Sequence, residues 1–176
     1  MWLSLTLIKE KIFLKRSDII AQKIFTLAEL LPRMAQWKFL RKEVAFTNGV
    51  FDILHPGHIF SLSQAAKEAD YLIVGVNSDD SVKRLKGDNR PVNSQDSRAL
   101  IIASLLMVDA VIIFEEDTPL GLIHSIKPDV LIKGGDYTIE EIVGAKEVIA
   151  NGGRVVINPT IEGYSSSHII EKLKTI

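Results

Sequence analysis

Two histidines flank a Pro-Gly pair in the segment 47–58, which begins at the end of a short apolar run. Proline suits the first turn of a helix, so Pro56 predicts that His55 lies near a helix cap and His58 within the first turn. Both imidazoles would then project near free backbone N–H groups and the positive end of the helix dipole. Such a terminus attracts anions, and phosphate is its usual guest. We therefore expect a phosphate site, where Gly57 lets the phosphates approach the backbone.

Two other interpretations compete with this one. Two surface histidines beside a capped helix would need no ligand, and for a lone histidine that interpretation would be favoured. Two histidines that flank Pro-Gly directly after an apolar strand favour a functional role instead. Histidines three residues apart could also share a zinc ion, but no third ligand with suitable spacing stands out. The chain has no cysteine, which excludes disulfides, cysteine-ligated zinc and thiol catalysis.

A second group of side chains that could bind phosphate lies in the segment 77–92, directly after another apolar run. By charge alone, a solvated basic loop is the simpler interpretation. A position beside the phosphate site favours contacts with the phosphate of an acceptor substrate, to which Arg98 of the next predicted helix would add. The basic residues of the segment are Lys83, Arg84, Lys86 and Arg90.

A third segment, 133–137, places two glycines between a lysine and an aspartate after an apolar strand. Gly134 and the glycine after it would permit a tight turn under a ligand. Lys133 would reach a phosphate, and Asp136 would accept a hydrogen bond from a ribose hydroxyl. A Gly-Gly pair alone says little, so this expectation depends on the position of the segment after a strand.

A fourth segment contains three consecutive serines, Ser165, Ser166 and Ser167, at the start of the last predicted helix. Serine is an ordinary N-cap residue, which explains these positions without any ligand. Serine hydroxyls at a helix N-terminus can also donate to the β- and γ-phosphates of a nucleotide. Both interpretations fit the three serines.

The elements that must position these segments alternate between strands and helices. Near-continuous apolar runs predict strands at 44–46, 71–76, 110–114, 130–133 and 154–157. Helical patterns cover 27–40, 94–106, 119–126, 139–150 and 166–173, and a further helix starts near Pro56. This alternation predicts an α/β fold, a Rossmann-like doubly wound parallel sheet of about five strands with helices on both faces. Ligands of such sheets bind beyond the carboxyl ends of the strands, where the four segments lie.

Local signals refine this pattern. Thr26 and Glu29 have the spacing of a capping box ahead of the first helix, although Pro32 lies inside that helix. Asn48-Gly49 predicts a turn after the first strand, and Asn151-Gly152-Gly153 predicts the end of a helix.

Composition limits the class of protein. The 176 residues are 47% hydrophobic and 24% charged, with a net charge of -1, which is typical of one globular domain. That balance gives no reason to expect a nucleic-acid or membrane surface. The largely apolar residues 1–8 are too short for a membrane span and lack the basic leader of a signal peptide. We expect a cytoplasmic protein.

The motif His55-Pro56-Gly57-His58 and the preceding Gly49-Val50-Phe51-Asp52 resemble the signatures of the cytidylyltransferase-like nucleotidyltransferase superfamily. In that superfamily the two histidines bind the nucleotide phosphates around the reacting centre. The resemblance implies a nucleotidyltransferase domain over 43–176, behind an N-terminal helical extension over 1–42. The superfamily also has a late Ser/Thr motif followed by a basic residue, where this chain reads Ser167-His168-Ile169-Ile170. That phosphate contact is missing unless His168 supplies it.

With this resemblance, the expected site has three groups of residues. The catalytic residues are His55, His58 and Lys133. The nucleotide-binding residues are Thr47, Asn48, Gly49, Val50, Phe51, Gly57, Gly134, Asp136, Ser165, Ser166 and Ser167. The residues for the substrate phosphate are Asp52, Lys83, Arg84, Arg90 and Arg98. Mg²⁺ or another divalent cation is expected to arrive with ATP, and no protein ligand is assigned to it.

Longer stretches resemble one subfamily, the adenylyltransferases that act on D-glycero-D-manno-heptose 1-phosphate. They are 46–49, 84–93, 114–119 and 133–137, and the resemblance extends over 43–173. It implies that ATP and the sugar phosphate give ADP-heptose and pyrophosphate. Many members carry a sugar-kinase domain, for which 176 residues leave no room. A stand-alone form is therefore expected, and a homodimer by analogy with the family.

Other functions remain open. A cytidylyltransferase acting on glycerol 3-phosphate or a related alcohol phosphate would share the same motifs. A non-catalytic nucleotide-sensing module could keep the glycine turns, but the presence of both histidines counts against it. A dinucleotide-dependent oxidoreductase is disfavoured because the first turn lacks Gly-x-Gly-x-x-Gly.

Overall fold

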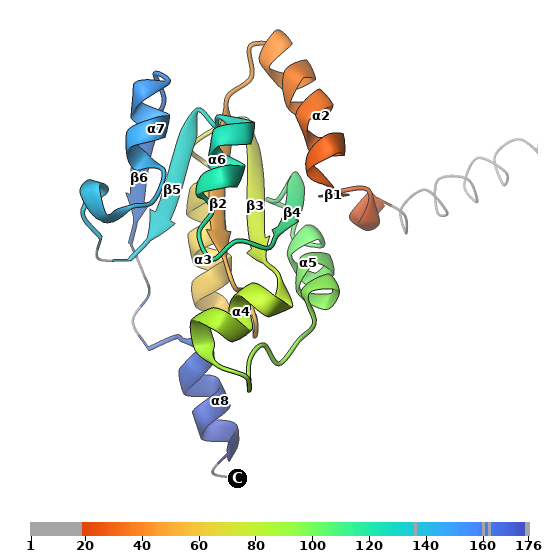
Figure 1. Ribbon diagram of the computed structural model, residues 1–176, viewed down its shortest axis with the longest axis vertical. Coiled ribbons are helices and arrows are strands. Elements are labelled where there is room, and N and C mark those ends of the chain that lie inside the picture. The colour runs from red at the N-terminus through yellow and green to blue at the C-terminus, as the bar shows by residue number, and fades with distance from the viewer. Residues whose placement is uncertain (1–18, 136, 160, 162, 175–176) are drawn as a thin grey trace, which may run out of the picture.

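The fold is a six-stranded parallel sheet with helices on both faces, seen in a computed structural model that describes residues 19–135, 137–159, 161 and 163–174 (Figure 1). The strands are β1 (Ile24–Phe25), β2 (Val44–Gly49), β3 (Tyr71–Asn77), β4 (Ala110–Phe114), β5 (Val130–Gly134) and β6 (Arg154–Asn158). The expected doubly wound sheet is confirmed, with one strand more than predicted. That strand, β1, has two residues, too few to produce an apolar pattern in the sequence.

Helices cover both faces of this sheet. They are α2 (Leu27–Phe39), α3 (Pro56–Ala65), α4 (Asp79–Lys86), α5 (Gln95–Ala103), α6 (Leu120–Ile126), the 3₁₀ turn η1 (Ile139–Glu141), α7 (Ala145–Ala150) and α8 (Ser166–Lys174). One apolar core lies between the sheet and α2, α6 and α7, and a second lies between the opposite face and α3 and α5. Helices α4 and α8 lie at the end toward which the strands point (Figure 1).

Helix α2 shows how local signals and packing combine. The Thr26 hydroxyl and the Glu29 carboxylate form the expected capping box, and the pKa of Glu29 is lowered by its hydrogen bonds from the Thr26 backbone and side chain. Pro32 lies inside the helix on its exposed side. Trp37 is buried and stacks on Tyr71 at the start of β3, with 4.2 Å between ring centroids. A buried aromatic anchor therefore fixes α2 to the sheet.

Three local predictions were wrong. Asn48 and Gly49 do not form a turn but end β2, because both pair with β3. The segment after β3 is helical rather than a loop, since the Ser78 hydroxyl caps α4 by accepting from the Ser81 N–H. The helix expected over 139–150 is divided into η1 and α7.

A glycine explains that division. Gly144 has φ +87°, a left-handed conformation that L side chains rarely adopt, and a Cβ there would collide with Ile123 of α6. The chain therefore turns between η1 and α7 and packs closely on α6. Two smaller shifts occur elsewhere: α5 is shorter than predicted at both ends, and α6 begins at Leu120, because Pro119 is its N-cap and not its first helical residue.

The order of the strands, β1-β4-β3-β2-β5-β6, creates a crevice between β2 and β5. From β2 the chain proceeds outward through β3 and β4, and then returns to the other side of β2 to form β5 and β6. A ligand site is expected where the direction of winding reverses. The β2–β5 ladder joins Ala45 with Val130 and Phe46 with Leu131, whereas the β2–β3 ladder continues to Gly49. The carboxyl end of β2 is thus open on its β5 side.

The proposed division of the chain at residue 42 stays a prediction, and residues 1–18 lie outside the described part. Within the described part, β1 pairs with β4 and α2 contributes Leu30, Met34 and Trp37 to the core of the sheet. No helix in the described ranges has the length and apolar character needed to cross a bilayer.

Candidate active site

The predicted histidine pair lies at the start of α3, after the segment that follows β2. His55 is the N-cap of α3 in an extended conformation, and Pro56 begins the helix as expected. The His58 N–H donates to the His55 carbonyl at 2.9 Å, which folds the first turn so that the two rings stack with centroids 3.8 Å apart. A Cβ at Gly57 would come within 3.0 Å of His55 Nδ1, so a side chain there would press on the ring.

Burial keeps both imidazoles neutral. Desolvation lowers the pKa of His55, and it lowers the pKa of His58 to about 4, with smaller contributions from His55 and Lys86. The Nδ1 atoms of both histidines are buried and have no hydrogen-bond partner in the described part of the protein. An unpaired buried nitrogen is costly, and a ligand atom would relieve that cost. The pair is therefore arranged to receive a ligand at the helix N-terminus.

Lys133 of β5 and Tyr137 of the segment after β5 line the same cavity as these histidines. Lys133 lies near the end of β5, and its Nζ is 5.9 Å from the centre of the Tyr137 ring. Burial lowers the pKa of Lys133, and no carboxylate among the described residues forms an ion pair with it. A partly desolvated ammonium without a carboxylate partner is well suited to hold a phosphate.

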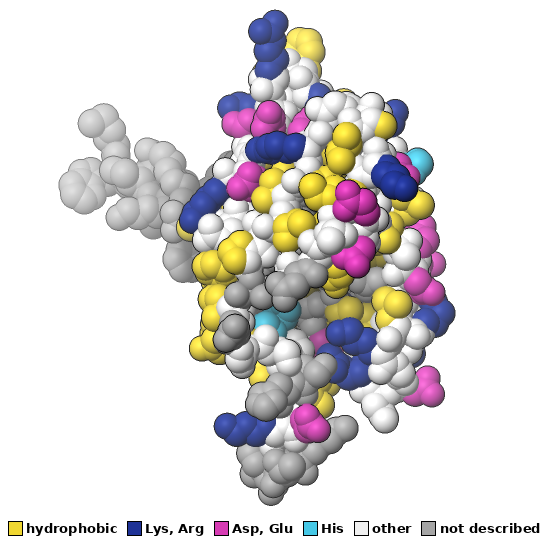
Figure 2. Space-filling view, turned by 90° about the vertical axis from the view of Figure 1, so that its left-hand side faces the viewer, with side chains coloured by type: hydrophobic (Ala, Val, Ile, Leu, Met, Phe, Trp, Pro, Cys, Tyr) yellow, Lys and Arg dark blue, Asp and Glu magenta, His cyan; other side chains and the backbone are white. Residues whose placement is uncertain are grey.

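Two cavities meet at the crevice between β2 and β5. The first, of about 310 Å³, contains the histidines, and its wall includes Ser61 and Tyr164. The second, of about 490 Å³, extends toward α4 and the loop before α6. Histidine surface is visible in a hollow on this side of the molecule, next to a group of basic side chains (Figure 2). The residues shared by the two cavities are Asn48, Gly49, Val50, Lys133 and Tyr137.

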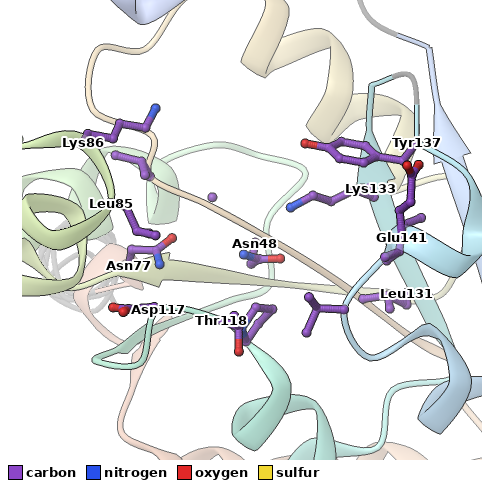
Figure 3. A pocket seen from close by; sticks show the side chains of 15 residues that line it. Asn48, Asn77, Leu85, Lys86, Asp117, Thr118, Leu131, Lys133, Tyr137 and Glu141 are labelled. Carbon is purple, nitrogen blue, oxygen red and sulfur yellow. The ribbon is translucent and has the colours of Figure 1, made fainter.

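We refer to the first cavity as the histidine pocket and to the second as the α4 pocket. Figure 3 shows the α4 pocket, with Lys133 and Tyr137 on one wall and Leu85 and Lys86 on the opposite wall. Asn48 lies between these walls. Because the pockets share a wall, ligands in the two would be neighbours at Lys133.

Most of the residues predicted for nucleotide binding and catalysis do come together. The residues that line the pockets are Thr47, Asn48, Gly49, Val50, Phe51, His55, Gly57, His58, Lys133 and Gly134. Asp136 lies outside the described residues, as does the side chain of Ser167. Ser165 is exposed, and the Ser166 hydroxyl donates to the Ile53 carbonyl at 3.0 Å, which ties α8 to the segment before α3.

The residues predicted to hold the substrate phosphate are placed differently. Lys83 and Arg84 form exposed ion pairs with Asp80 and Asp117. Asp52 is 1% exposed and accepts hydrogen bonds from Arg90 and from the backbone N–H groups of residues 92 and 93. A buried carboxylate would repel a phosphate, so this arrangement assigns Asp52 to holding the chain.

Arg98 does not line either pocket. It is fully buried, and its guanidinium donates to the carbonyls of Asn93 and Val50 and to the Asp79 carboxylate. No part of it is exposed to a ligand in this arrangement. The predicted contact with a substrate phosphate is therefore replaced by three contacts within the protein.

Several residues that line the pockets were not assigned to the site from the sequence. They are Lys86, Asn77, Tyr164 and the residues around Thr118. Lys86 was grouped with the other basic residues of its segment and not selected. The helical register of α4 would have separated them, because Val82 is buried and the positions three and four residues later line the α4 pocket. Asn77, Thr118 and Tyr164 become neighbours of the site only through the sheet order, which the sequence does not reveal.

The described side chains do not form a metal site of their own. Within the described ranges, no group of three His, Cys, Asp or Glu side chains could hold a metal ion, which also leaves the zinc interpretation of the histidine pair without a third ligand. A cation that arrives with a triphosphate needs few protein ligands, because the phosphates and water supply most of its oxygens. The site is compatible with a metal of that kind.

Comparison with known proteins decides the family. The model of the family described as Cytidylyltransferase-like matches residues 46–172, from the third residue of β2 through most of α8. The chain belongs to the cytidylyltransferase-like family. The family resemblance that the histidine motif indicated is thus confirmed.

Curated relatives of this cytidylyltransferase-like chain include the "Bifunctional protein HldE" of Hyphomonas neptunium, which is 51% identical over 83% of the chain. The protein of the same name from Haemophilus influenzae (strain PittEE) is 52% identical over 87% of the chain. The chain spans 30% and 32% of the length of these two relatives.

Solved structures share the fold of this chain. A lipopolysaccharide core biosynthesis protein from Thermoplasma volcanium is 31% identical, with a TM-score of 0.55, over 70% of this chain and 99% of that one. A pantothenate synthetase from Thermus thermophilus has a TM-score of 0.58 over 87% of this chain and 70% of that one. At 18% identity, it shows a shared fold alone.

Proposed function

We propose that the chain transfers an adenylyl group from ATP to D-glycero-D-manno-heptose 1-phosphate and releases pyrophosphate. The observation that carries the nucleotidyl transfer is the pair of stacked, neutral histidines at the N-terminus of α3, facing Lys133 across a crevice that joins two pockets. The sugar substrate is supported by about half-identity to HldE relatives and by the resemblance of segments 84–93 and 133–137 to heptose 1-phosphate adenylyltransferases.

In this proposal ATP occupies the histidine pocket and the sugar phosphate occupies the α4 pocket. The histidine pocket offers a helix N-terminus and the imidazoles for the phosphates, and the Tyr164 ring for apolar contact. The α4 pocket offers Lys86 for the acceptor phosphate, and Asp117 and Glu141 as acceptors for sugar hydroxyls. Lys133, on the shared wall, would contact phosphate groups from both sides.

The proposed reaction is an in-line displacement at the α-phosphorus of ATP. An oxygen of the acceptor phosphate forms the new bond as the bond from the α-phosphorus to the bridging oxygen breaks, and pyrophosphate leaves with that electron pair. The second pKa of a phosphate monoester is about 6, so the acceptor is largely dianionic at neutral pH and needs no general base. The protein must hold two anions together and stabilise charge at the α-phosphate.

Each residue then has a defined task. His55 and His58 donate hydrogen bonds to the phosphates and do not abstract a proton. Lys133 offsets the charge that develops between the nucleotide and the acceptor. A divalent cation such as Mg²⁺, bound with the nucleotide, would neutralise charge on the phosphates. A homodimer and a cytoplasmic location belong to this proposal, and sedimentation of the purified protein tests the former.

Pyrophosphate release tests the proposed function. ATP and CTP are each paired with heptose 1-phosphate and with glycerol 3-phosphate, in the presence of Mg²⁺. Release with ATP and heptose 1-phosphate alone is the expected result. Release with CTP and glycerol 3-phosphate would overturn the proposed substrates but not the family. Nucleotide binding without release from any pair would favour a sensing module.

A further inference from the structure

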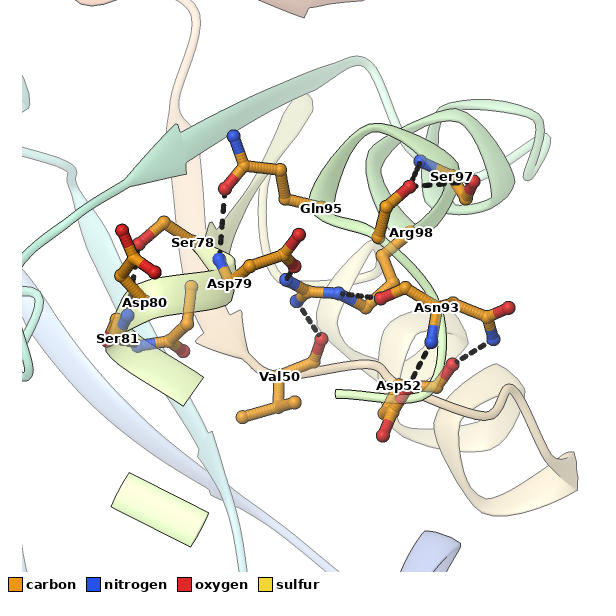
Figure 4. Close-up of polar contacts among 12 residues, drawn as sticks. Val50, Asp52, Ser78, Asp79, Asp80, Ser81, Asn93, Gln95, Ser97 and Arg98 are labelled. Atoms are coloured by element: carbon orange, nitrogen blue, oxygen red, sulfur yellow. Dashed lines mark hydrogen bonds and ion pairs between the residues drawn. The ribbon is translucent and has the colours of Figure 1, made fainter. Parts of the chain in front are cut away.

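A fully buried arginine, Arg98, contacts both the wall that the two pockets share and the helix α4. Arg98 lies on α5 with no exposed surface, and each of its nitrogens has a partner (Figure 4). Nη1 donates to the Val50 carbonyl at 2.6 Å, Nη2 donates to Asp79 Oδ1 at 2.8 Å, and Nε donates to the Asn93 carbonyl at 3.0 Å. Removing a buried charged donor would leave these partners unsatisfied, so the contacts constrain three separate segments.

The first of these segments forms the wall of the histidine pocket. Val50 lines both pockets, and Phe51 directly after it has φ +50°, a left-handed conformation that is unfavourable for a bulky residue. Arg98 holds the carbonyl on one side of Phe51, and Asp52 is held on the other side by the backbone N–H groups of residues 92 and 93. Such strain persists only where the surroundings determine the conformation.

The strained residue touches the catalytic histidine. The Phe51 ring lies 5.3 Å from the His58 ring, centroid to centroid, and a Cβ at Gly49 would come within 3.1 Å of the Phe51 ring. Phe51 therefore fills the space between the end of β2 and the first turn of α3. Its position, and with it the support of His58, depends on the contacts that hold residues 50 and 52.

The ion pair between Arg98 and Asp79 connects Arg98 to α4, the helix whose far end lines the α4 pocket. Asp79 is the first residue of α4, and its backbone N–H is also held, by Gln95 of the same helix as Arg98. At the opposite end of α4, Leu85 and Lys86 line the α4 pocket. A helix of this length moves as a unit, so the position of Lys86 follows the position of Asp79.

We propose that Arg98 is a positioning residue that sets the distance between the nucleotide and the acceptor by holding Val50 and Asp79 at once. It touches neither substrate. Its hydrogen bond to the Val50 carbonyl fixes the wall shared by the two pockets, and its ion pair with Asp79 fixes the helix that carries Lys86. The assignment of the acceptor to the α4 pocket rests on the proposed function, whereas the contacts of Arg98 with the shared wall do not.

Two variants separate the contact of Arg98 with Val50 from its ion pair with Asp79. Arg98→Lys keeps the charge near Asp79 but loses the planar fork that reaches Val50 and Asn93. Asp79→Asn removes the ion pair and leaves the Arg98–Val50 contact in place. Arg154→Lys is the matched control, because Arg154 is half-exposed on β6 and pairs with Glu43 and Glu68 far from the pockets.

The measurements are ATP binding by calorimetry, the KM for each substrate from pyrophosphate release, and denaturant unfolding. Arg98→Lys should weaken ATP binding about tenfold, the effect of one lost buried hydrogen bond to a charged group. Asp79→Asn should raise the KM for heptose 1-phosphate several-fold while the Kd for ATP stays unchanged. Arg154→Lys should match the wild type in all three measurements.

Several results would overturn the proposal. If Arg98→Lys is less stable but its folded fraction binds ATP like the wild type, Arg98 has a structural role alone. If Arg98→Lys does not fold, Asp79→Asn decides, and an unchanged KM for the acceptor rejects the coupling. If wild-type protein binds ATP without turning over heptose 1-phosphate, the proposed function fails, and the ATP affinity of Arg98→Lys still decides the role of Arg98.

Discussion

The two walls of the site are held in different ways. The wall that follows β2 is fixed by a continuous ladder with β3, by buried contacts from Arg98 and by the hydrogen bonds of Asp52. Strand β5 pairs with β6 as far as Gly134, but the segment after it has local contacts such as the exposed capping box of Thr138 and Glu141. Tyr137 in this wall is 46% exposed.

This difference matches the chemistry proposed for each wall. Groups that stabilise a transition state act best when they are in place before the substrates bind. The histidines lie on the wall that is fixed in advance. The segment after β5 is held by hydrogen bonds at exposed positions, so it can adjust when ligands bind. The following predictions test whether catalysis depends on the first wall more than on the second.

The largest effect is expected for the histidine wall. His58→Ala should lower the rate of pyrophosphate release by roughly 10²–10³, as loss of a transition-state donor does. The fold should persist, since an alanine is tolerated in a helix. Steady-state kinetics and circular dichroism measure the two effects.

His124→Ala is the matched control for that experiment. His124 lies on α6, its side chain is 58% exposed, and its contact is a long ion pair with Glu147. We expect wild-type turnover from this variant. A folded His58→Ala protein that also turns over like the wild type would remove His58 from the mechanism.

A smaller effect is expected for the β5 wall. Lys133→Gln should lower kcat about 10- to 100-fold, the range of a lost hydrogen bond to a charged group. Lys146→Gln, at an exposed position of α7, serves as the control. If Lys133→Gln costs more than His58→Ala, the comparison is reversed and the second wall dominates catalysis.

The pH dependence of ATP binding should show whether His58, on the wall that follows β2, contacts the phosphates. His58 has a pKa of about 4 in the free protein, and the nearby phosphates of bound ATP favour the imidazolium and raise that value. Affinity gained from His58 should therefore rise as pH falls from 7 toward 4, by at most about tenfold per unit.

Calorimetry in buffers of different ionisation enthalpy measures the accompanying proton uptake. His58→Gln corrects for the protonation of ATP itself, because only the contribution of the imidazole is removed. Equal proton uptake by the wild type and His58→Gln between pH 5 and 7 would show that His58 does not meet the phosphates.

The smallest effect on activity is expected for glycine substitutions outside the pockets, at Gly144 before α7 and at Gly152 after it. Gly144→Ala should lower the free energy of unfolding, because φ +87° costs about 1 kcal/mol or more and the new methyl group meets Ile123. Gly152→Ala shares a positive φ of +84° but has open space, so it should lose less. Urea unfolding compares the two, and kcat of the folded enzyme should hardly change in either.

The sequence predicts the features that depend on neighbouring residues. Pro56 after an apolar strand was enough to place His55 at a helix cap, and Thr26 with Glu29 was enough to start α2. The strands β3 and β4 follow from apolar runs that can only be buried. These signals act over a few residues and need no knowledge of the fold.

Features that depend on distant partners could not be predicted. Arg98 looked like a ligand residue, since nothing local shows that the carbonyl of Val50, 48 residues earlier, lies within reach. Asp52 had the same ambiguity, because its partners lie in the segment after α4. Gly144 divides a helical pattern because Ile123 of another helix occupies the space of a side chain.

The pairing of β1 with β4 has a consequence for the order in which the protein forms during synthesis. Residues 24 and 25 leave the ribosome before the other strands that the structure describes, yet their partners Val111 and Ile112 belong to β4. Helix α2 likewise emerges before the Tyr71 ring on which Trp37 stacks. Chains elongate at about 5–20 residues per second, so β1 is synthesised several seconds before β4, the strand with which it pairs. We expect the N-terminal edge of the sheet to close after the central strands have already paired.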